Sequence, residues 1–210
     1  MKLNHFLAAA AALFFAGALW AQTPEEIVEK MSAQMDRGDM EGMVMDLNMK
    51  MPIIGTISSH NVTLGEKLKT IVSAHGKAIT SWMDETTEWE YNPEKGEITI
   101  SARKKEKNDE KESSDVDAFK SVNDGYDLSI HKETPQAWYI LAKKSKTNKE
   151  KDDPKKIEMA ISKATFLPIY LKTKQSMITI SIENVSIGVS EKDVTFNPAD
   201  YPNATIIDKR

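Results

Sequence analysis

The stretch MVMDLNMKM, residues 43–51, decides the fold, because it places an apolar side chain at every second position. Successive side chains of a β-strand point to opposite faces of a sheet, so these side chains share one face. They are Met43, Met45, Leu47, Met49 and Met51. Four of the five are methionine, whereas strands usually favour valine and isoleucine. The stretch therefore predicts a strand with one face of long, flexible thioether side chains.

Almost everything after Gly42 repeats this alternation, which indicates β-strands rather than helices. Trp89 and Tyr91 share one face of TEWEYN, and Ile98 and Ile100 share one face of EITISARK. The other strand-like segments are 66–73, 77–84, 126–130, 137–144, 156–163, 167–174, 176–189 and 193–197. The chain is therefore predicted to be mainly β with few helices, as an antiparallel sheet of about ten or eleven strands with one apolar face.

One helix is predicted before the methionine strand, in TPEEIVEKMSAQMDRGD, residues 23–39. Thr23 is a suitable N-cap, Pro24 fits the first helical position, Glu26 completes a capping box, and Gly38 offers a stop. An apolar stripe with helical spacing is formed by Ile27, Met31 and Met35. This helix is expected to lie on the apolar face of the sheet, where its stripe can also act as a lid over a ligand.

The first 21 residues resemble a secretory signal peptide, with Lys2 ahead of an apolar run and small residues at the end. The run from Phe6 to Trp20 is shorter than the roughly 20 residues that a membrane-spanning helix needs. We therefore expect a signal peptide at 1–21 and one domain at 22–210. The chain contains no cysteine, so disulfides are excluded.

The charges are scattered along the chain, with 28 basic and 32 acidic residues and a formal net charge of −4. This balance gives no reason to expect nucleic acid as a partner. Two segments are strongly charged, at 103–115 and 143–156, and a short helix is predicted at 116–122 between them. Such segments are usually solvated, although the lysines in and beside the second one are also suited to docking on a membrane partner.

No catalytic signature is found in the chain. His60, His75 and His131 do not belong to a zinc-protease motif, and no nucleophile elbow, phosphate-binding loop or dinucleotide fingerprint occurs. Neighbouring carboxylates lie in charged segments without the apolar surroundings that tune an acid for proton transfer. We therefore expect neither an enzyme nor a metal or cofactor site.

A sheet this large curls, and its concave side must be filled by side chains, by a second sheet or by a ligand. Methionine suits a variable filling because its side chain adapts to many apolar shapes. The same methionines are equally suited to an ordinary packed core. Both interpretations stay open on the pattern alone.

Several segments, taken in order, resemble the LolA-type carriers of outer-membrane lipoproteins, in the LolA/LolB-type superfamily. They are the leader with TPEEIVEKM, the methionine strand, SWMDETTEWEYNPEKGEITI (81–100) and VTFNPADYPNATIIDKR (194–210). The resemblance implies a strongly curved half-barrel with lid helices over an apolar cavity. Some carriers of this family use an arginine on an early strand to hold the lid. Here no arginine occurs between Asn61 and Trp82, so Lys67 or Lys69 would have to serve.

The resemblance implies a periplasmic carrier, expected to be a monomer, that moves acylated lipoproteins or a similar lipid cargo. Its partners would be an inner-membrane ABC transporter and an outer-membrane acceptor. The expected cavity wall comprises Met43, Met45, Leu47, Met49, Met51, Trp89, Tyr91, Ile98 and Ile100, with Ile27, Met31 and Met35 as the lid. The alternative is an exported β-sheet module of the cell envelope that has a fully packed core and acts through protein contacts.

Overall fold

The computed structural model describes residues 22–104, 122–123, 125–151 and 153–210. The expected signal peptide, most of the charged run at 103–115 and all but the last residue of the helix expected at 116–122 lie outside these ranges.

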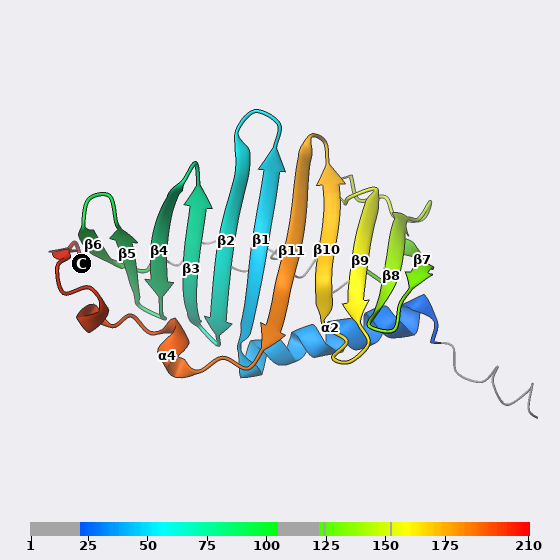
Figure 1. Cartoon of the computed structure of the whole chain (residues 1–210), viewed down its shortest axis with the longest axis horizontal. Helices are drawn as coiled ribbons and strands as arrows, with labels where there is room; N and C mark the ends of the chain where they lie inside the picture. Colours follow the sequence, from blue (N-terminus) through cyan, green and yellow to red (C-terminus); the bar gives the residue numbers. More distant parts are fainter. Residues whose placement is uncertain (1–21, 105–121, 124, 152) are drawn as a thin grey trace, which may run out of the picture.

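One open, curved sheet of twelve strands forms the body of the protein (Figure 1). The spatial order is β12-β6-β5-β4-β3-β2-β1-β11-β10-β9-β8-β7, with every neighbouring pair antiparallel except the parallel pair β12 and β6. The strands are β1 Met43–Met51, β2 Gly55–Leu64, β3 Lys67–Ala74, β4 Lys77–Met83, β5 Thr87–Asn92, β6 Glu97–Ala102, β7 Tyr126–Glu133, β8 Ala137–Lys144, β9 Lys156–Ser162, β10 Pro168–Gln175, β11 Ile178–Ile187 and β12 Thr205–Asp208. The mainly β fold class is confirmed.

Helix α2, Pro24–Glu41, begins as the sequence predicts. The Thr23 side chain accepts from the Glu26 backbone N–H, and the Glu26 carboxylate accepts from the Thr23 N–H, each at 3.2 Å. The predicted stop at Gly38 is wrong, because the helix continues to Glu41 and ends at Gly42 with a φ of 78°. The left-handed region suits glycine, and an added Cβ there would lie 2.5 Å from the Val189 Cβ.

Two strand assignments need correction. β2 was not recognised in the sequence, because its TISSHN segment carries polar residues on both faces and shows no apolar alternation. The predicted strand at 193–197 is instead the short helix α4, Glu191–Val194, with extended residues after it. The 3-10 helix η1, Pro198–Asp200, then leads to β12.

The register defines two faces of the sheet. We call the side to which the odd-numbered residues of β1 point the methionine face, and the other side the reverse face. Met43 lies opposite Thr63, and Thr63 lies opposite Leu68. Leu68 lies opposite Met83, so Met83 also points to the methionine face. Its neighbour Trp82 therefore points to the reverse face.

The two halves of the sheet bury opposite faces. From β1 through β11 to β7, α2 packs on the methionine face, in a cluster that includes Met45, Leu171 and Ile182. From β3 to β6, the C-terminal segment 191–201 packs on the reverse face, through ring contacts to Trp82 and an α4 contact to β3. The sheet thus has two apolar layers, one on each side.

Candidate functional site

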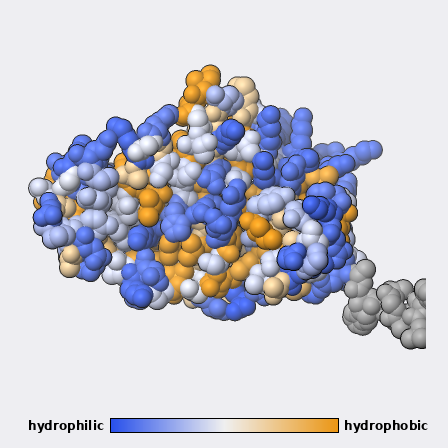
Figure 2. Space-filling model, viewed as in Figure 1, coloured by the Kyte–Doolittle hydropathy of each residue, from blue (hydrophilic) through white to orange (hydrophobic). Residues whose placement is uncertain are grey.

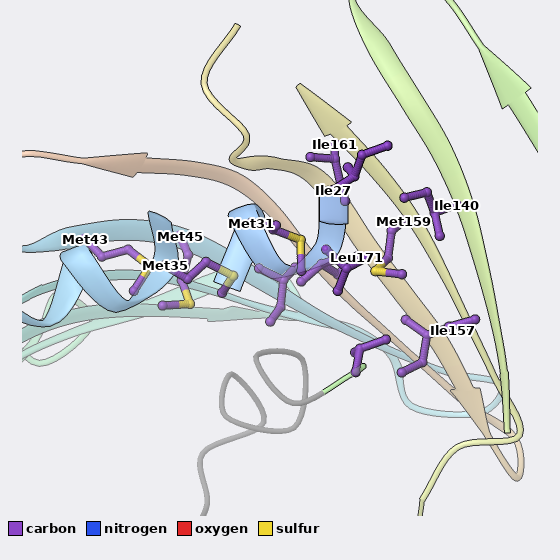
Figure 3. Packing of buried hydrophobic residues seen from close by; sticks show 14 residues of the cluster. Ile27, Met31, Met35, Met43, Met45, Ile140, Ile157, Met159, Ile161 and Leu171 are labelled. Atoms are coloured by element: carbon purple, nitrogen blue, oxygen red, sulfur yellow. The ribbon is translucent and has the colours of Figure 1, made fainter. Parts of the chain in front are cut away.

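A methionine-rich seam joins α2 to β1. Ile27, Met31 and Met35 of α2 are fully buried, as the predicted stripe requires, and Met43 and Met45 of β1 are nearly so. Figure 3 shows Met35 beside the side chains of Met43 and Met45. The contact is therefore made largely of thioethers, which fill irregular spaces and change rotamer easily.

The seam continues into a larger apolar cluster beneath α2. Its other buried members are Val28, Val122, Ile140, Ala142, Ile157, Met159, Ile161, Leu171 and Ile182. At the edge of this cluster the Lys30 ammonium lies 5.1 Å from the Phe166 ring centroid, a cation–π geometry. The helix is thus held mainly by apolar packing.

Gly38 allows α2 to approach β1 closely. A Cβ built on Gly38 would lie 2.8 Å from the Met43 Cε and 3.1 Å from the Met43 Cβ. The glycine that resembles a helix stop in the sequence instead makes room for a methionine of the seam.

Beyond the seam, the methionine face carries a less covered apolar strip. Leu47, Met49 and Met51 are half-buried. Ile57 of β2 lies opposite Met49. Leu47 lies opposite Ser59, and the same row across the sheet continues with Val72 of β3 and Ile79 of β4. Val72 is 39% exposed and Ile79 is 37% exposed. We call Leu47, Met49, Met51, Ile57, Val72 and Ile79 the open strip.

The open strip includes three residues that the sequence analysis missed, namely Ile57, Val72 and Ile79. Ile57 was missed because β2 was not recognised, and the other two because the pairing register could not be read from alternation alone. For Val72 and Ile79 the available signal is the recognised strand that carries each of them, at 66–73 and 77–84.

The expected cavity wall is wrong in one respect: Trp89, Tyr91, Ile98 and Ile100 lie on the reverse face. Trp82 lies opposite Trp89, which lies opposite Ile100. Tyr91 lies two residues after Trp89 on β5, so it points to the same face, and it lies opposite Ile98 of β6. They therefore cannot form one wall with the methionines of β1.

These reverse-face residues pack under the C-terminal segment. Phe196 stacks on Trp89 with ring centroids 5.7 Å apart and meets Trp82 edge-on at 5.3 Å. Tyr201 meets Tyr91 at 4.6 Å. Offset and edge-on aromatic pairs of this kind add stability beyond their buried area, so this layer is a structural core.

Lys67 and Lys69 also belong to this layer. Lys67 forms an ion pair with Glu191 of α4, and the Lys69 ammonium lies 5.7 Å from the Trp82 ring centroid. Both lysines point to the reverse face, whereas α2 lies on the other side. Neither can therefore replace the arginine that holds the lid in some LolA-type carriers.

A polar cluster on the reverse face joins β1, β2 and β11. Asp46 accepts from Asn184 at 2.7 Å and lies 2.7 Å from the His60 Nδ1. Partial burial alone would raise the pKa of Asp46, but the hydrogen bonds from Asn184 and His60 hold it below its usual value. Asn184 has a φ of 55° and lies where β11 carries one extra residue against β1. This cluster therefore serves to fix a β-bulge.

The described residues contain no group of three or more histidine, cysteine, aspartate or glutamate side chains that could hold a metal ion. Within the same residues, no helix has the length and apolar character needed to span a membrane.

The comparisons with known proteins find similar chains among solved structures. No family model matches the chain, and no curated protein matches it by sequence. Among solved structures, an uncharacterized conserved protein from Thermus thermophilus is similar, at 13% identity and a TM-score of 0.42, covering 90% of this chain and 100% of the other.

Two further solved structures are also similar to this chain. A LolA superfamily protein from Nitrosomonas europaea has 11% identity and a TM-score of 0.32, covering 84% of this chain and 99% of the other. A putative outer membrane lipoprotein-sorting protein domain from Vibrio parahaemolyticus has 13% identity and a TM-score of 0.30, covering 85% and 97%. LolA-like proteins are thus among the structures to which this chain is similar.

Proposed function

We propose that this protein is a periplasmic carrier that shields the acyl chains of lipoproteins, or of a similar lipid cargo, between α2 and the methionine face. The proposal makes it a binding protein rather than an enzyme, exported through a signal peptide at 1–21 and working between an inner-membrane transporter and an outer-membrane acceptor. The observation that carries it is the methionine seam, which continues into the open strip.

The energetics of an acyl chain explain why such a cargo needs shielding. Exposing a chain to water costs about 0.8 kcal/mol per methylene, so roughly 14 methylenes cost about 11 kcal/mol. A carrier must also release its cargo, so its site should be adaptable rather than tightly complementary. Methionine side chains meet this requirement because they repack around different apolar shapes.

The arrangement of α2 supports a seam that can open. The described contacts of the α2 stripe are apolar, and the nearest side chains of β1 are methionines, a residue type that changes rotamer easily. In the proposed mechanism, an acyl chain enters along the open strip and displaces the methionine side chains under α2. Leu47, Met49 and Met51 form the entry, and Met31, Met35, Met43 and Met45 form the part that repacks.

Binding of a fluorescent fatty acid tests the proposal. The variant Met49→Asp with Val72→Asp places two carboxylates in the open strip. Asn48→Asp with Ser73→Asp is the matched control, because it adds the same charges one position away on the same strands, on the reverse face.

We expect saturable binding by the wild type and the control, and binding weakened by about tenfold or more in the strip variant, because a buried carboxylate costs several kcal/mol. Equal binding by a folded strip variant would refute the site. A wild type that binds no acyl ligand would instead favour the exported interaction module with a fully packed core.

A further inference from the structure

Two neighbouring hairpins expose large apolar side chains at one end of the sheet. The β1–β2 turn carries Ile53, which is 96% exposed, and Ile54, which is 50% exposed. The β10–β11 turn carries Met177, which is 67% exposed, with Ile178 after it at 38%. Since β1 pairs with β11, the two turns lie side by side. We call these four residues the apolar tips.

The apolar tips protrude from the rest of the sheet. Both hairpins rise at the upper end of the sheet in Figure 1, whereas α2 and α4 lie at the opposite end. Figure 2 shows hydrophobic residues standing at this upper extremity. Exposed isoleucines at the end of a hairpin contribute nothing to a core, so their burial requires an outside partner.

Lysines surround the apolar tips on the reverse face. Lys50 and Lys174 are each the last residue but one of the strand that enters a turn, and both lie opposite Thr179 of β11. A groove of about 310 Å³ lies just below, lined by Lys155, Lys156, Glu158, Lys172, Thr173, Lys174 and Thr179. Among the described residues, Glu158 is the one carboxylate in this lining, and it pairs with Lys156 at 2.7 Å. The groove therefore carries a net positive charge.

The lysines at this end of the sheet differ in whether they pair with an acid. Lys156 pairs with Glu158, and Lys143 lies between Lys156 and Asp127 on its two neighbouring strands. Lys50, Lys172 and Lys174 form no ion pair within the described residues. A surface of this kind attracts an anionic partner.

We propose that this end of the sheet docks on an anionic phospholipid bilayer. Ile53, Ile54 and Met177 enter the acyl region, and Lys50, Lys174 and the groove lysines bind headgroup phosphates. Such a bilayer has an apolar interior beneath negatively charged headgroups. The protruding apolar side chains fit the interior, and the lysines behind them fit the headgroups. The apolar tips are other residues than those of the open strip, whose Met51 lies just before them at the end of β1, and the docking does not depend on the proposed cargo.

Vesicle flotation tests the docking. The protein is expressed with its own leader, recovered from the periplasm, and mixed with vesicles of phosphatidylcholine alone or of phosphatidylcholine with phosphatidylglycerol. Ile53→Ser with Ile54→Ser removes the apolar contact, and Ile169→Ser with Ile206→Ser is its control, since those isoleucines are 47% and 53% exposed elsewhere.

A second pair of variants tests the charge. Lys50→Gln with Lys174→Gln removes two lysines beside the tips, and Lys192→Gln with Lys209→Gln removes two exposed lysines away from them, in α4 and directly after β12. Circular dichroism confirms that each variant is folded.

We expect flotation with the anionic vesicles only, weakened about tenfold by the isoleucine variant and about fivefold for each tip lysine removed, with both controls unchanged. Added salt should also weaken it. Absence of flotation with anionic vesicles would overturn the proposal and assign the apolar tips to a protein partner. Equal flotation of all variants would overturn it as well.

Discussion

Replacing Gly38 by alanine tests how closely α2 is seated on β1. Two opposing effects determine the result. Alanine in place of glycine inside a helix stabilises by about 1 kcal/mol. The new Cβ, however, would lie 2.8 Å from the Met43 Cε and 3.1 Å from the Met43 Cβ. The methyl end can rotate away, but the Cβ is fixed to the strand backbone, so overpacking should cost about 1–3 kcal/mol.

We therefore expect Gly38→Ala to lower the free energy of unfolding by up to about 2 kcal/mol, after the gain in helix propensity is subtracted. Met43→Ala alone should cost about 2–5 kcal/mol, because it leaves a cavity under the helix. In the Met43→Ala background the cost of the first change should become smaller by about 1 kcal/mol. The Met43 Cε is then absent and space is left beside the added methyl group, whereas the Cβ of residue 43 stays 3.1 Å away.

Urea unfolding followed by tryptophan fluorescence and by circular dichroism measures all four members of this double-mutant cycle. The diagnostic result is the difference between the effects of Gly38→Ala in the two backgrounds. If Gly38→Ala changes the free energy of unfolding equally in the wild type and in Met43→Ala, the Met43 side chain does not pack against Gly38, and the described seam is incorrect.

Two further predictions concern the reverse face. Phe196→Ala should lower the free energy of unfolding by about 2–3 kcal/mol, because the ring stacks on Trp89 and is half-buried. The same change should speed proteolysis of the C-terminal segment. An unchanged proteolysis rate would contradict the packing. The pKa of Asp46 is lowered in the folded state, because its carboxylate accepts hydrogen bonds from Asn184 and His60. These hydrogen bonds therefore stabilise the fold above about pH 4. Their contribution is lost as the pH falls through the lowered pKa. Asp46→Asn should therefore destabilise at pH 7 by roughly 1 kcal/mol and by less at pH 3, as measured by urea unfolding; a constant difference would rule out this cause.

Local signals in the sequence were sufficient for much of the fold. The capping box at Thr23 and Glu26 predicts the start of α2 because it depends on neighbouring residues alone. The end of α2 could not be predicted in the same way. Gly38 is required by a contact with Met43, and that contact exists only once the helix lies on the sheet.

The candidate site shows the same division between local and distant information. Alternation places Met43 and Met45 on one face of β1, and Trp89 and Tyr91 on one face of β5. It does not reveal whether those two faces are on the same side, because that depends on the register of every strand between them. The cover over Trp89 comes from Phe196, about a hundred residues later in the chain.

Native mass spectrometry of the protein, purified from the periplasm without detergent, tests the central claim most directly. A carrier should retain lipid or acylated peptide at close to one molecule per chain, and organic extraction of the same sample would identify its class. The account predicts this bound mass. A mass equal to the chain alone, unchanged after acyl ligands are added, would contradict it and show that the methionines of β1 belong to an ordinary packed core.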